Sequence, residues 1–232
     1  MIVILDYEMG NVGSIQNMLR KIGVREVTIS RDAGDIRRAD KLILPGVGAF
    51  DAGMGRLREF GLPDLIREHA LEQGKPLLGI CLGMQLLGQS SQEGTLSGLG
   101  LLPFSCKRFD FPLETALKIP HMGWDRTYVR TQTPLTEGLE PRERYYYVHS
   151  YHAACEDPAL VLMECEYGYR FPSAVYGGSV YGVQFHPEKS HLYGMKLLEN
   201  FAERCSTFLD FGIKPKDMPK QLQILLDNYV PF

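Results

Sequence analysis

Long apolar runs are absent from the sequence. Its most apolar stretches, such as residues 41–50, fall far short of the roughly 20 residues that a membrane-spanning helix needs. The amino-terminal residues include no basic segment and no small-residue cleavage site, so we expect no secretion signal. Basic residues number 25 and acidic residues 28, and the net charge of -3 disfavours nucleic acid or an anionic membrane surface as partner. We therefore expect a cytoplasmic protein.

The sequence has five cysteines, and their pattern argues against two structural uses. The five cysteines are odd in number and none form a CxxC pair, which disfavours a disulfide framework and a thiolate zinc site. They are Cys81, Cys106, Cys155, Cys165 and Cys205. Internal repeats are absent, and the content of hydrophobic residues (44%) and charged residues (23%) is that of an ordinary globular protein. A chain of 232 residues is long enough for one well-buried core.

Over the first ninety residues, short apolar runs alternate with helical patterns. The runs at 1–7, 24–30, 40–46 and 76–80 have the composition of strands, and the last of them is wholly apolar. Ser14 is placed to cap the helix that follows the first run, and Gly23 to end it. The stretch 51–73 has a helical pattern interrupted by glycine and proline. This alternation predicts a parallel sheet covered by helices.

Between about residues 100 and 185 the pattern changes to short aromatic and β-branched segments. They are separated by proline, glycine and acidic turns, which predicts a mixed or antiparallel extension of the sheet. A last helix is expected from about His191 to Leu209. Its predicted buried face consists of Leu192, Met195, Leu198 and Phe201.

The strongest chemical signal is the segment GICLGMQ at residues 79–85. An apolar strand ends at Cys81 between Gly79 and Gly83, and a helix follows, as in the elbow that presents a nucleophile from a sharp turn. Such a turn places the sulfur near the positive end of the helix and leaves the Leu82 amide free to bind an oxyanion. The alternative is a small buried residue beside a helix, which is the usual place of a free cysteine.

A thiol nucleophile needs a base, and the base needs an orienting group. In GVQFHPEKS, residues 182–190, His186 and Glu188 are two apart, so on a strand they share one face and the carboxylate can hold the imidazole. The alternative is a solvated turn. The acid follows the histidine, which argues against an α/β-hydrolase, where the order is nucleophile, acid, histidine. The loop LPGVGAF, residues 44–50, can supply a second oxyanion donor and lacks the lysine of a phosphate loop.

Six segments together resemble a known family. Three are similar to class I, or triad, glutamine amidotransferases: PGVGAF, GICLGMQLL and GVQFHPEKS. Three more are similar to the glutaminase subunit of imidazole glycerol phosphate synthase: PHMGWD, YYYVHSYHA and FPSAV. The resemblance implies an α/β fold, a three-layer, open, mostly parallel sheet with flanking helices, similar to flavodoxin. It covers an amidotransferase domain at residues 1–205 and leaves 206–232 as a carboxy-terminal extension.

The resemblance also implies roles for residues. Cys81 would attack the side-chain carboxamide of L-glutamine, His186 would transfer protons and Glu188 would orient it, with no cofactor and no metal. The implied oxyanion and substrate-binding residues are Val47, Gly48, Leu82, Gln85, Glu93, His149, Ser150 and Tyr151. His149 would act through its backbone, and for Glu93 the alternative is a surface carboxylate. A metal site in HSYH, residues 149–152, lacks a third ligand nearby.

The implied partner is a (β/α)8 cyclase subunit (HisF-type), which forms a heterodimer with the glutaminase. It combines ammonia with a ribotide, giving imidazole glycerol phosphate for histidine biosynthesis and aminoimidazole carboxamide ribotide. The implied partner contacts are Asn11, Met122, Trp124, Tyr146 and Lys189, for which the alternative is burial beside the active site.

Three departures from the family pattern leave other functions open. Glu8 stands where the family usually has glycine, Asp125 stands where it usually has asparagine, and the chain continues beyond residue 205. Both substitutions are expected on the partner side. One alternative is a paralogous glutaminase that supplies ammonia for amidination of a surface-glycan sugar. A second, from another class, is an inactive scaffold subunit, which the presence of all three triad residues disfavours.

Overall fold

The computed structural model describes residues 1–112 and 114–207. The strands are β1 (Ile2–Leu5), β2 (Val27–Ser30), β3 (Lys41–Leu44), β4 (Leu77–Ile80), β5 (Ser90–Ser91), β6 (Phe104–Arg108), β7 (His121–Val129), β8 (Arg142–His149), β9 (Tyr151–Cys155), β10 (Val161–Tyr167), β11 (Tyr169–Gly177) and β12 (Val180–Val183). The α-helices are α1 (Val12–Lys21), α2 (Ala33–Arg38), α3 (Phe50–Glu59), α4 (Leu62–Arg67), α5 (Leu82–Leu87) and α6 (His191–Glu203). A π-helical turn, η1 (Glu68–Glu72), and three 3-10 turns, η2 (Pro134–Thr136), η3 (Pro158–Leu160) and η4 (Pro187–Lys189), complete the elements.

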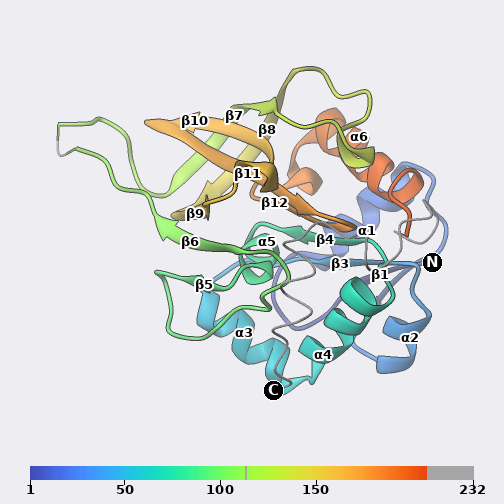
Figure 1. Cartoon of the computed structure of the whole chain (residues 1–232). Helices are drawn as coiled ribbons and strands as arrows, with labels where there is room; N and C mark the ends of the chain where they lie inside the picture. The colour runs from blue at the N-terminus through green and yellow to red at the C-terminus, as the bar shows by residue number, and fades with distance from the viewer. Residues whose placement is uncertain (113, 208–232) are drawn as a thin grey trace.

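A nine-stranded sheet forms the centre of the fold, with the strand order β2-β1-β3-β4-β12-β11-β10-β7-β8. The five strands from β2 to β12 run parallel to one another, and the four from β11 to β8 continue the sheet as antiparallel pairs. A second sheet has the order β5-β6-β9. Figure 1 shows the antiparallel strands extending away from the helix-covered parallel half. The prediction of a parallel sheet with a mixed or antiparallel extension is confirmed, and the extension is antiparallel.

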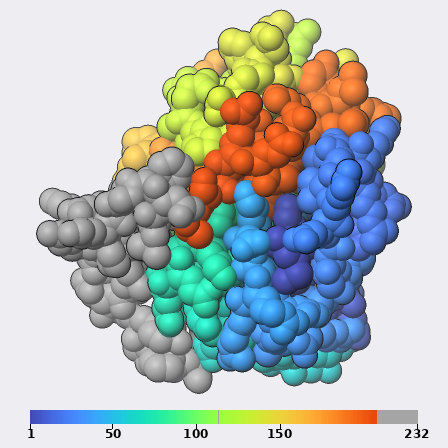
Figure 2. Space-filling model, turned by 90° about the vertical axis from the view of Figure 1, so that its right-hand side faces the viewer, coloured from blue at the N-terminus to red at the C-terminus, as the bar shows by residue number. Residues whose placement is uncertain are grey.

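The parallel half is the middle of three layers. Along β1, Val3 and Leu5 pack into the core beneath α2 to α5, whereas Ile2 and Ile4 pack beneath α1 and α6. Successive side chains of a strand point to opposite faces, so wholly apolar strands such as β4 fit a sheet that is buried on both faces. In Figure 2, α6 (red-orange) lies on the surface beside the blue amino-terminal segments.

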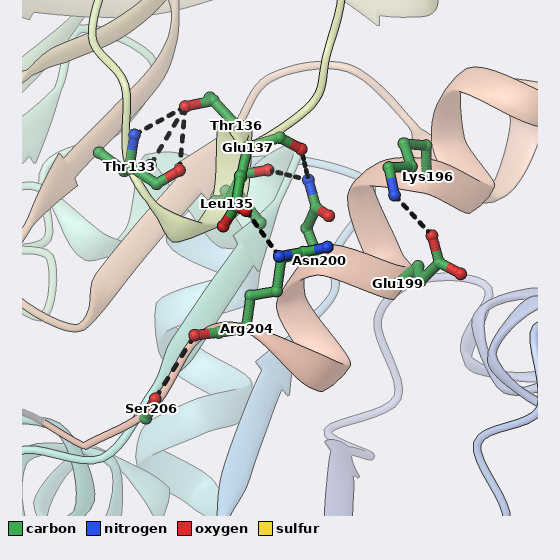
Figure 3. Close-up of polar contacts among 9 residues, drawn as sticks. All are labelled: Thr133, Leu135, Thr136, Glu137, Lys196, Glu199, Asn200, Arg204 and Ser206. Carbon is green, nitrogen blue, oxygen red and sulfur yellow. Dashed lines mark hydrogen bonds and ion pairs between the residues drawn. The ribbon is translucent and has the colours of Figure 1, made fainter. Parts of the chain in front are cut away.

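A buried amide and an ion pair link the end of helix α6 to the antiparallel half. Asn200 Nδ2 donates to the backbone oxygens of Leu135, 3.0 Å away, and Glu137, 2.8 Å away, as Figure 3 shows. Arg204, just beyond the helix, forms an ion pair with the Glu137 carboxylate at 2.7 Å. These contacts join the last helix to the loop that follows β7.

The predicted end of α6 was wrong, and its predicted buried face was right for Leu198 and Phe201 but wrong for Leu192. The helix ends at Glu203, and the residues that follow through 207 are not helical. The buried face is Gly194, Leu197, Leu198, Asn200 and Phe201, whereas Leu192 is 75% exposed. The first turn of α6 stands at the edge of the sheet, where an apolar side chain at helical spacing has no layer to pack against. The predicted end at Leu209 and the segment QLQILLDNYV lie outside the described residues.

The predicted cap of the first helix was also wrong. Asn11 is the N-cap of α1, and its side-chain oxygen accepts a hydrogen bond from the Ser14 amide at 3.2 Å. Asn11 and Ser14 are both good capping residues. The helix begins before Ser14, so that Ser14 supplies an amide to the cap instead of accepting one.

The aromatic segment 144–153 divides between the two sheets. Strand β8 pairs with β7 in the large sheet, and β9 pairs with β6 in the small one. Because β8 is an edge strand, its backbone is available to other elements. Tyr146 accepts a hydrogen bond from the His186 amide at 2.9 Å, and its own amide donates to Ser190 Oγ at 3.0 Å. None of the helices in the described ranges is long and apolar enough to cross a membrane.

Candidate active site

Cys81 lies in a strained turn between β4 and α5. Its backbone angles are φ 54° and ψ −109°, in the region that favours glycine, and such a residue costs about 1–3 kcal/mol. A Cβ atom added at Gly83 would lie 1.8 Å from the Leu44 oxygen, and one at Gly79 would lie 2.7 Å from the Gly83 oxygen. Both neighbours must therefore be glycine for the turn to close and present the thiol at the end of β4.

The Leu82 amide is not free, contrary to the prediction. It donates to the Gly46 oxygen at 3.3 Å, so a backbone carbonyl occupies the place where an oxyanion would bind. Gly46 packs closely here, because a Cβ on it would meet the Tyr7 hydroxyl at 2.5 Å. Gly48 follows with φ 115°, a conformation natural to glycine alone. The loop 45–48 therefore has to turn before the Leu82 amide can bind a ligand.

His186 and Glu188 meet as the spacing suggested, but on a turn and not on a strand. Strand β12 ends at Val183, and Glu188 lies in η4, where its Oε1 atom is 2.7 Å from His186 Nδ1. Both side chains are almost fully buried. Burial disfavours the charged ring, yet hydrogen bonding and negative charge from Cys81 and Glu188 outweigh it and raise the pKa of His186 to about 9.

His186 uses only one of its ring nitrogens in a well-formed hydrogen bond. Nε2 is buried and makes no other hydrogen bond among the described residues, so it faces the nearby Cys81 thiol. The Cys81 sulfur itself lies 3.8 Å from Gln184 Nε2 and 4.0 Å from the Val148 oxygen. The predicted nucleophile, base and orienting carboxylate therefore lie close together, although the sequence separates Cys81 from His186 by more than a hundred residues.

One cavity of about 300 Å³ opens beside the nucleophile. Cys81 and all eight residues predicted to bind substrate or oxyanion line it: Val47, Gly48, Leu82, Gln85, Glu93, His149, Ser150 and Tyr151. Two lining residues, Pro120 and Val148, were not predicted. Both belong to segments already quoted, PHMGWD and YYYVHSYHA, so their neighbourhood in the sequence was the available signal.

Two of the predicted side chains also have structural contacts. Glu93 Oε2 accepts from the Phe50 amide at 2.9 Å, which places its negative charge at the amino-terminal end of α3. One oxygen thus stabilises the helix, and the carboxylate still faces the cavity. Gln85 Nε2 donates to the Tyr151 oxygen at 3.1 Å and to Gln184 Oε1 at 3.2 Å. Both amide hydrogens of Gln85 are therefore used within the protein, and Oε1 remains for a ligand.

The His149 ring is fully committed inside the protein. Its Nδ1 atom is 2.8 Å from the Tyr151 oxygen, and its Nε2 atom is 3.1 Å from His121 Nδ1. Burial holds the pKa of His149 well below its usual range, so the ring is neutral. This leaves the backbone as the part of His149 that can contact a ligand, as the resemblance implied.

The histidines of HSYH do not form a metal site in the described part of the chain. His152 points away, with its ring nitrogens 2.8 Å from the Ala153 oxygen and 2.9 Å from the Tyr169 hydroxyl. Potential metal-binding atoms of His121, Asp125 and Cys165 do come within 4.8 Å of one another. His121 Nε2 and Asp125 Oδ2 contact each other at 3.3 Å, and we assign no ion to this group.

Four of the five predicted partner contacts gather on the outer side of β7 and β8. Met122 is 62% exposed and Trp124 is 38% exposed. The Tyr146 ring packs edge-on against Trp124 with ring centres 6.2 Å apart, and Lys189 Nζ lies 5.8 Å from the Tyr146 ring centre. Asn11 is exposed and caps α1. The side chains of α6 add Leu192 and Tyr193 to the exposed apolar residues of the chain.

Asp125 and Glu8, the two substitutions relative to the family pattern, both contact other side chains of the chain. Asp125 contacts His121 on the face of β7 opposite to Trp124, so it does not belong to the Met122 and Trp124 surface. Glu8 adopts φ 65°, where glycine is favoured, and its carboxylate lies 3.2 Å from Arg31 and 3.3 Å from Arg56. These two ion pairs hold Glu8 in a conformation that glycine would adopt without strain.

Comparisons with known proteins agree with this geometry. The family model of class I glutamine amidotransferases matches residues 3–205. A putative GMP synthase protein from Thermoplasma acidophilum has the same fold, with a TM-score of 0.67 and 20% identity, covering 92% of this chain and 97% of that one. PurLQS from Thermotoga maritima matches with a TM-score of 0.64 and 21% identity, covering 87% and 96%. The chain belongs to the class I glutamine amidotransferases.

Curated relatives narrow the class further. Imidazole glycerol phosphate synthase subunit HisH 2 of Methanococcus maripaludis is 51% identical, with 88% of this chain and 100% of the relative aligned. Subunit HisH of Sulfurimonas denitrificans is 50% identical over 88% and 98%, and that of Aquifex aeolicus is 44% identical over 88% and 99%. Within its class, the chain is a member of the HisH subunit family of imidazole glycerol phosphate synthase.

Proposed function

We propose that this chain hydrolyses L-glutamine to glutamate and ammonia with the triad Cys81, His186 and Glu188, as the glutaminase subunit of imidazole glycerol phosphate synthase. The observation that carries this proposal is the position of the strained Cys81 turn. The turn forms part of the wall of a cavity, and this cavity is lined by all eight residues expected to bind the substrate or the oxyanion. The buried His186–Glu188 pair lies beside Cys81. Membership of the HisH family supports the pathway, histidine biosynthesis.

The geometry suggests how the reaction runs. Cys81 first gives its thiol proton to His186 Nε2, and the thiolate then attacks the carboxamide carbon of glutamine and forms a tetrahedral intermediate. His186, whose pKa of about 9 favours the charged ring at neutral pH, then gives its Nε2 proton to the leaving nitrogen, so that ammonia departs and a thioester remains. Neutral His186 next takes a proton from water, which attacks the thioester and releases glutamate. Glu188 holds the ring in one orientation throughout.

The oxyanion site requires a change in the loop 45–48. In our proposal the Leu82 amide and a peptide of the Val47–Gly48 segment bind the developing negative charge. In the structure the Leu82 amide donates a hydrogen bond to the Gly46 oxygen at 3.3 Å. In our proposal this arrangement is a resting state, in which the amide is not yet available to the oxyanion. We infer that the chain alone is a slow glutaminase, and that binding of its partner favours the turned loop.

The proposed partner is a (β/α)8 cyclase subunit (HisF-type) in a heterodimer, acting in the cytoplasm. A receiving subunit fits the chemistry, since free ammonia would become ammonium in water. The exposed group of Met122, Trp124, Tyr146 and Lys189 supports the place of contact, because tryptophan and tyrosine are frequent interface anchors. We further propose that residues 1–205 are the amidotransferase domain.

The alternative functions find no support in the comparisons. The relatives described above carry the name of the imidazole glycerol phosphate synthase subunit. An inactive scaffold would not need the strained turn at Cys81 or the buried His186–Glu188 pair.

A glutamate-release assay tests the proposal. The purified chain is incubated with L-glutamine alone, with the cyclase subunit, and with the cyclase and its ribotide. We expect release to be slow in the first case and strongly stimulated in the last, and to be abolished by Cys81→Ala. Glutamate release by Cys81→Ala at the wild-type rate would contradict the mechanism, and lack of stimulation by the cyclase would contradict the partner.

A further inference from the structure

One buried side chain touches the nucleophile and is absent from the predicted site. Gln184 is fully buried between β12 and His186, and its Nε2 atom lies 3.8 Å from Cys81 Sγ, within reach of a hydrogen bond to sulfur. The residue lies in the quoted segment GVQFHPEKS, but nothing in its local sequence indicates that it reaches a cysteine 103 positions away.

The contacts around Gln184 decide which end of its amide faces the sulfur. A backbone carbonyl can only accept, so the Gln85 group that lies 3.1 Å from the Tyr151 oxygen is its NH2. The same nitrogen lies 3.2 Å from the Gln184 side chain, which must therefore present its oxygen there. The remaining end of the Gln184 amide is the NH2, and it points at Cys81.

The Tyr151 oxygen, from which these assignments start, has a second hydrogen-bond partner. His149 Nδ1, in a neutral ring, donates to the same Tyr151 oxygen at 2.8 Å. The carbonyl thus accepts from two side chains, which stand on β8 and α5. A chain of hydrogen bonds that is satisfied at each step keeps Gln184 from rotating its amide, since rotation would place two donors or two acceptors against each other.

We propose that Gln184 is a further catalytic residue, which donates a hydrogen bond to the Cys81 sulfur whenever that sulfur carries negative charge. The inference rests on the proposed glutaminase function and deepens it. The sulfur is anionic before it attacks the carboxamide carbon and again when water displaces it from the thioester. A fixed donor therefore favours the reactive form of the thiol and makes the thiolate a better leaving group.

Thiol reactivity measures this role without glutamine. We compare labelling of Cys81 by iodoacetamide at pH 7 in the wild type and in Gln184→Met, which has similar volume but no donor. The labelled peptide is quantified by mass spectrometry. We expect labelling to slow by about 10-fold, the lower end of what a hydrogen bond to a charged group contributes, because the contact is long. In Gln184→Glu, which places a carboxylate beside the sulfur, labelling is expected to slow further.

Two controls separate this effect from damage to the fold. Gln16, on α1, also has a side-chain amide that donates a hydrogen bond, to the Val27 oxygen at 3.3 Å. The control variant Gln16→Met removes that amide and should leave Cys81 labelling unchanged. Cys155 is an internal reference, because burial raises the pKa of its thiol to about 12. Its labelling should stay equally slow in every variant, and faster labelling would reveal a loosened structure.

In the glutaminase assay with the cyclase subunit, Gln184→Met should lower kcat by about 10-fold with little change in KM, because Gln184 contacts the sulfur and does not line the cavity. Labelling of Gln184→Met within about 2-fold of the wild type, with Cys155 unchanged, would overturn the inference. Since labelling needs neither glutamine nor a partner, slower labelling in a chain that releases no glutamate would uphold the contact while refuting the proposed function.

Discussion

The His186–Glu188 pair allows a prediction whose magnitude follows from the structure. In Glu188→Gln the amide oxygen can still accept from Nδ1 at the observed 2.7 Å, so the variant removes the charge and keeps the hydrogen bond. The rise in the pKa of His186 from 6.5 to about 9 corresponds to roughly 3 kcal/mol in favour of the charged ring. Cys81 and Glu188 both contribute to it. We expect the variant to lower this pKa by about 1 or more.

The same pair links stability to pH. Because the pKa of His186 is higher in the folded chain than in the unfolded one, its contribution is fully present below about pH 6.5 and is lost as the pH rises through about 9. The contribution of His186 to the free energy of unfolding should therefore fall by up to roughly 3 kcal/mol between pH 6 and pH 10. In Glu188→Gln the fall should be smaller by about 1–2 kcal/mol.

Two measurements check these expectations. NMR titration of the His186 ring gives its pKa directly, and urea unfolding at pH 6 and pH 10 gives the stability difference. Cys81→Ala serves as the matched control, because it removes the other contribution and leaves Glu188 in place. A wild-type midpoint near 6.5, or the same midpoint in Glu188→Gln, would refute the reasoning about the charge pair.

Three further predictions concern the elements that support the site. Gly83→Ala should destabilise the chain by about 2 kcal/mol or more in urea unfolding, because the new Cβ would lie 1.8 Å from a backbone oxygen, whereas Gly55→Ala meets nothing within 4 Å and should not. Asn11→Ala should cost about 1 kcal/mol as a lost helix cap, with Asn11→Ser close to the wild type, and equal stability of both would contradict the assigned cap. Trp124→Ala should weaken binding of the cyclase subunit by about 10-fold or more in calorimetry while the melting temperature stays unchanged, and unchanged affinity would remove Trp124 from the interface.

Local patterns predicted most of the fold because the parallel strands are short and apolar on both faces. The run at 76–80 needs no distant information to be recognised as a buried strand. Errors arose where two local choices were equally good. Asn11 and Ser14 are both residue types that cap helices well. Leu192 has the spacing of the buried face of its helix, but its side chain is exposed.

The proposed triad could be placed from the sequence because its members lie in short segments with strong local constraints. Two glycines mark the turn at Cys81, and His186 precedes Glu188 by two residues. Gln184 was not predictable in the same way, since its significance depends on Gln85 and Tyr151, which come from a helix and a strand distant in sequence. The occupied Leu82 amide was missed for the same reason, as the Gly46 oxygen that fills it belongs to another loop.

The sequence by itself determined which residues we propose to carry the chemistry, because a nucleophile in a tight turn requires glycines around it and a short-range pair can form between neighbours along the chain. Only the tertiary structure decided how these parts are arranged. It brought β4, β12 and β8 together so that Cys81, His186 and the cavity share one place, set the Gly46 oxygen against the Leu82 amide, and turned the Gln184 amide toward the sulfur. The physical reason is that hydrogen bonds have direction and residues far apart in sequence have no local signal of the direction in which they will meet.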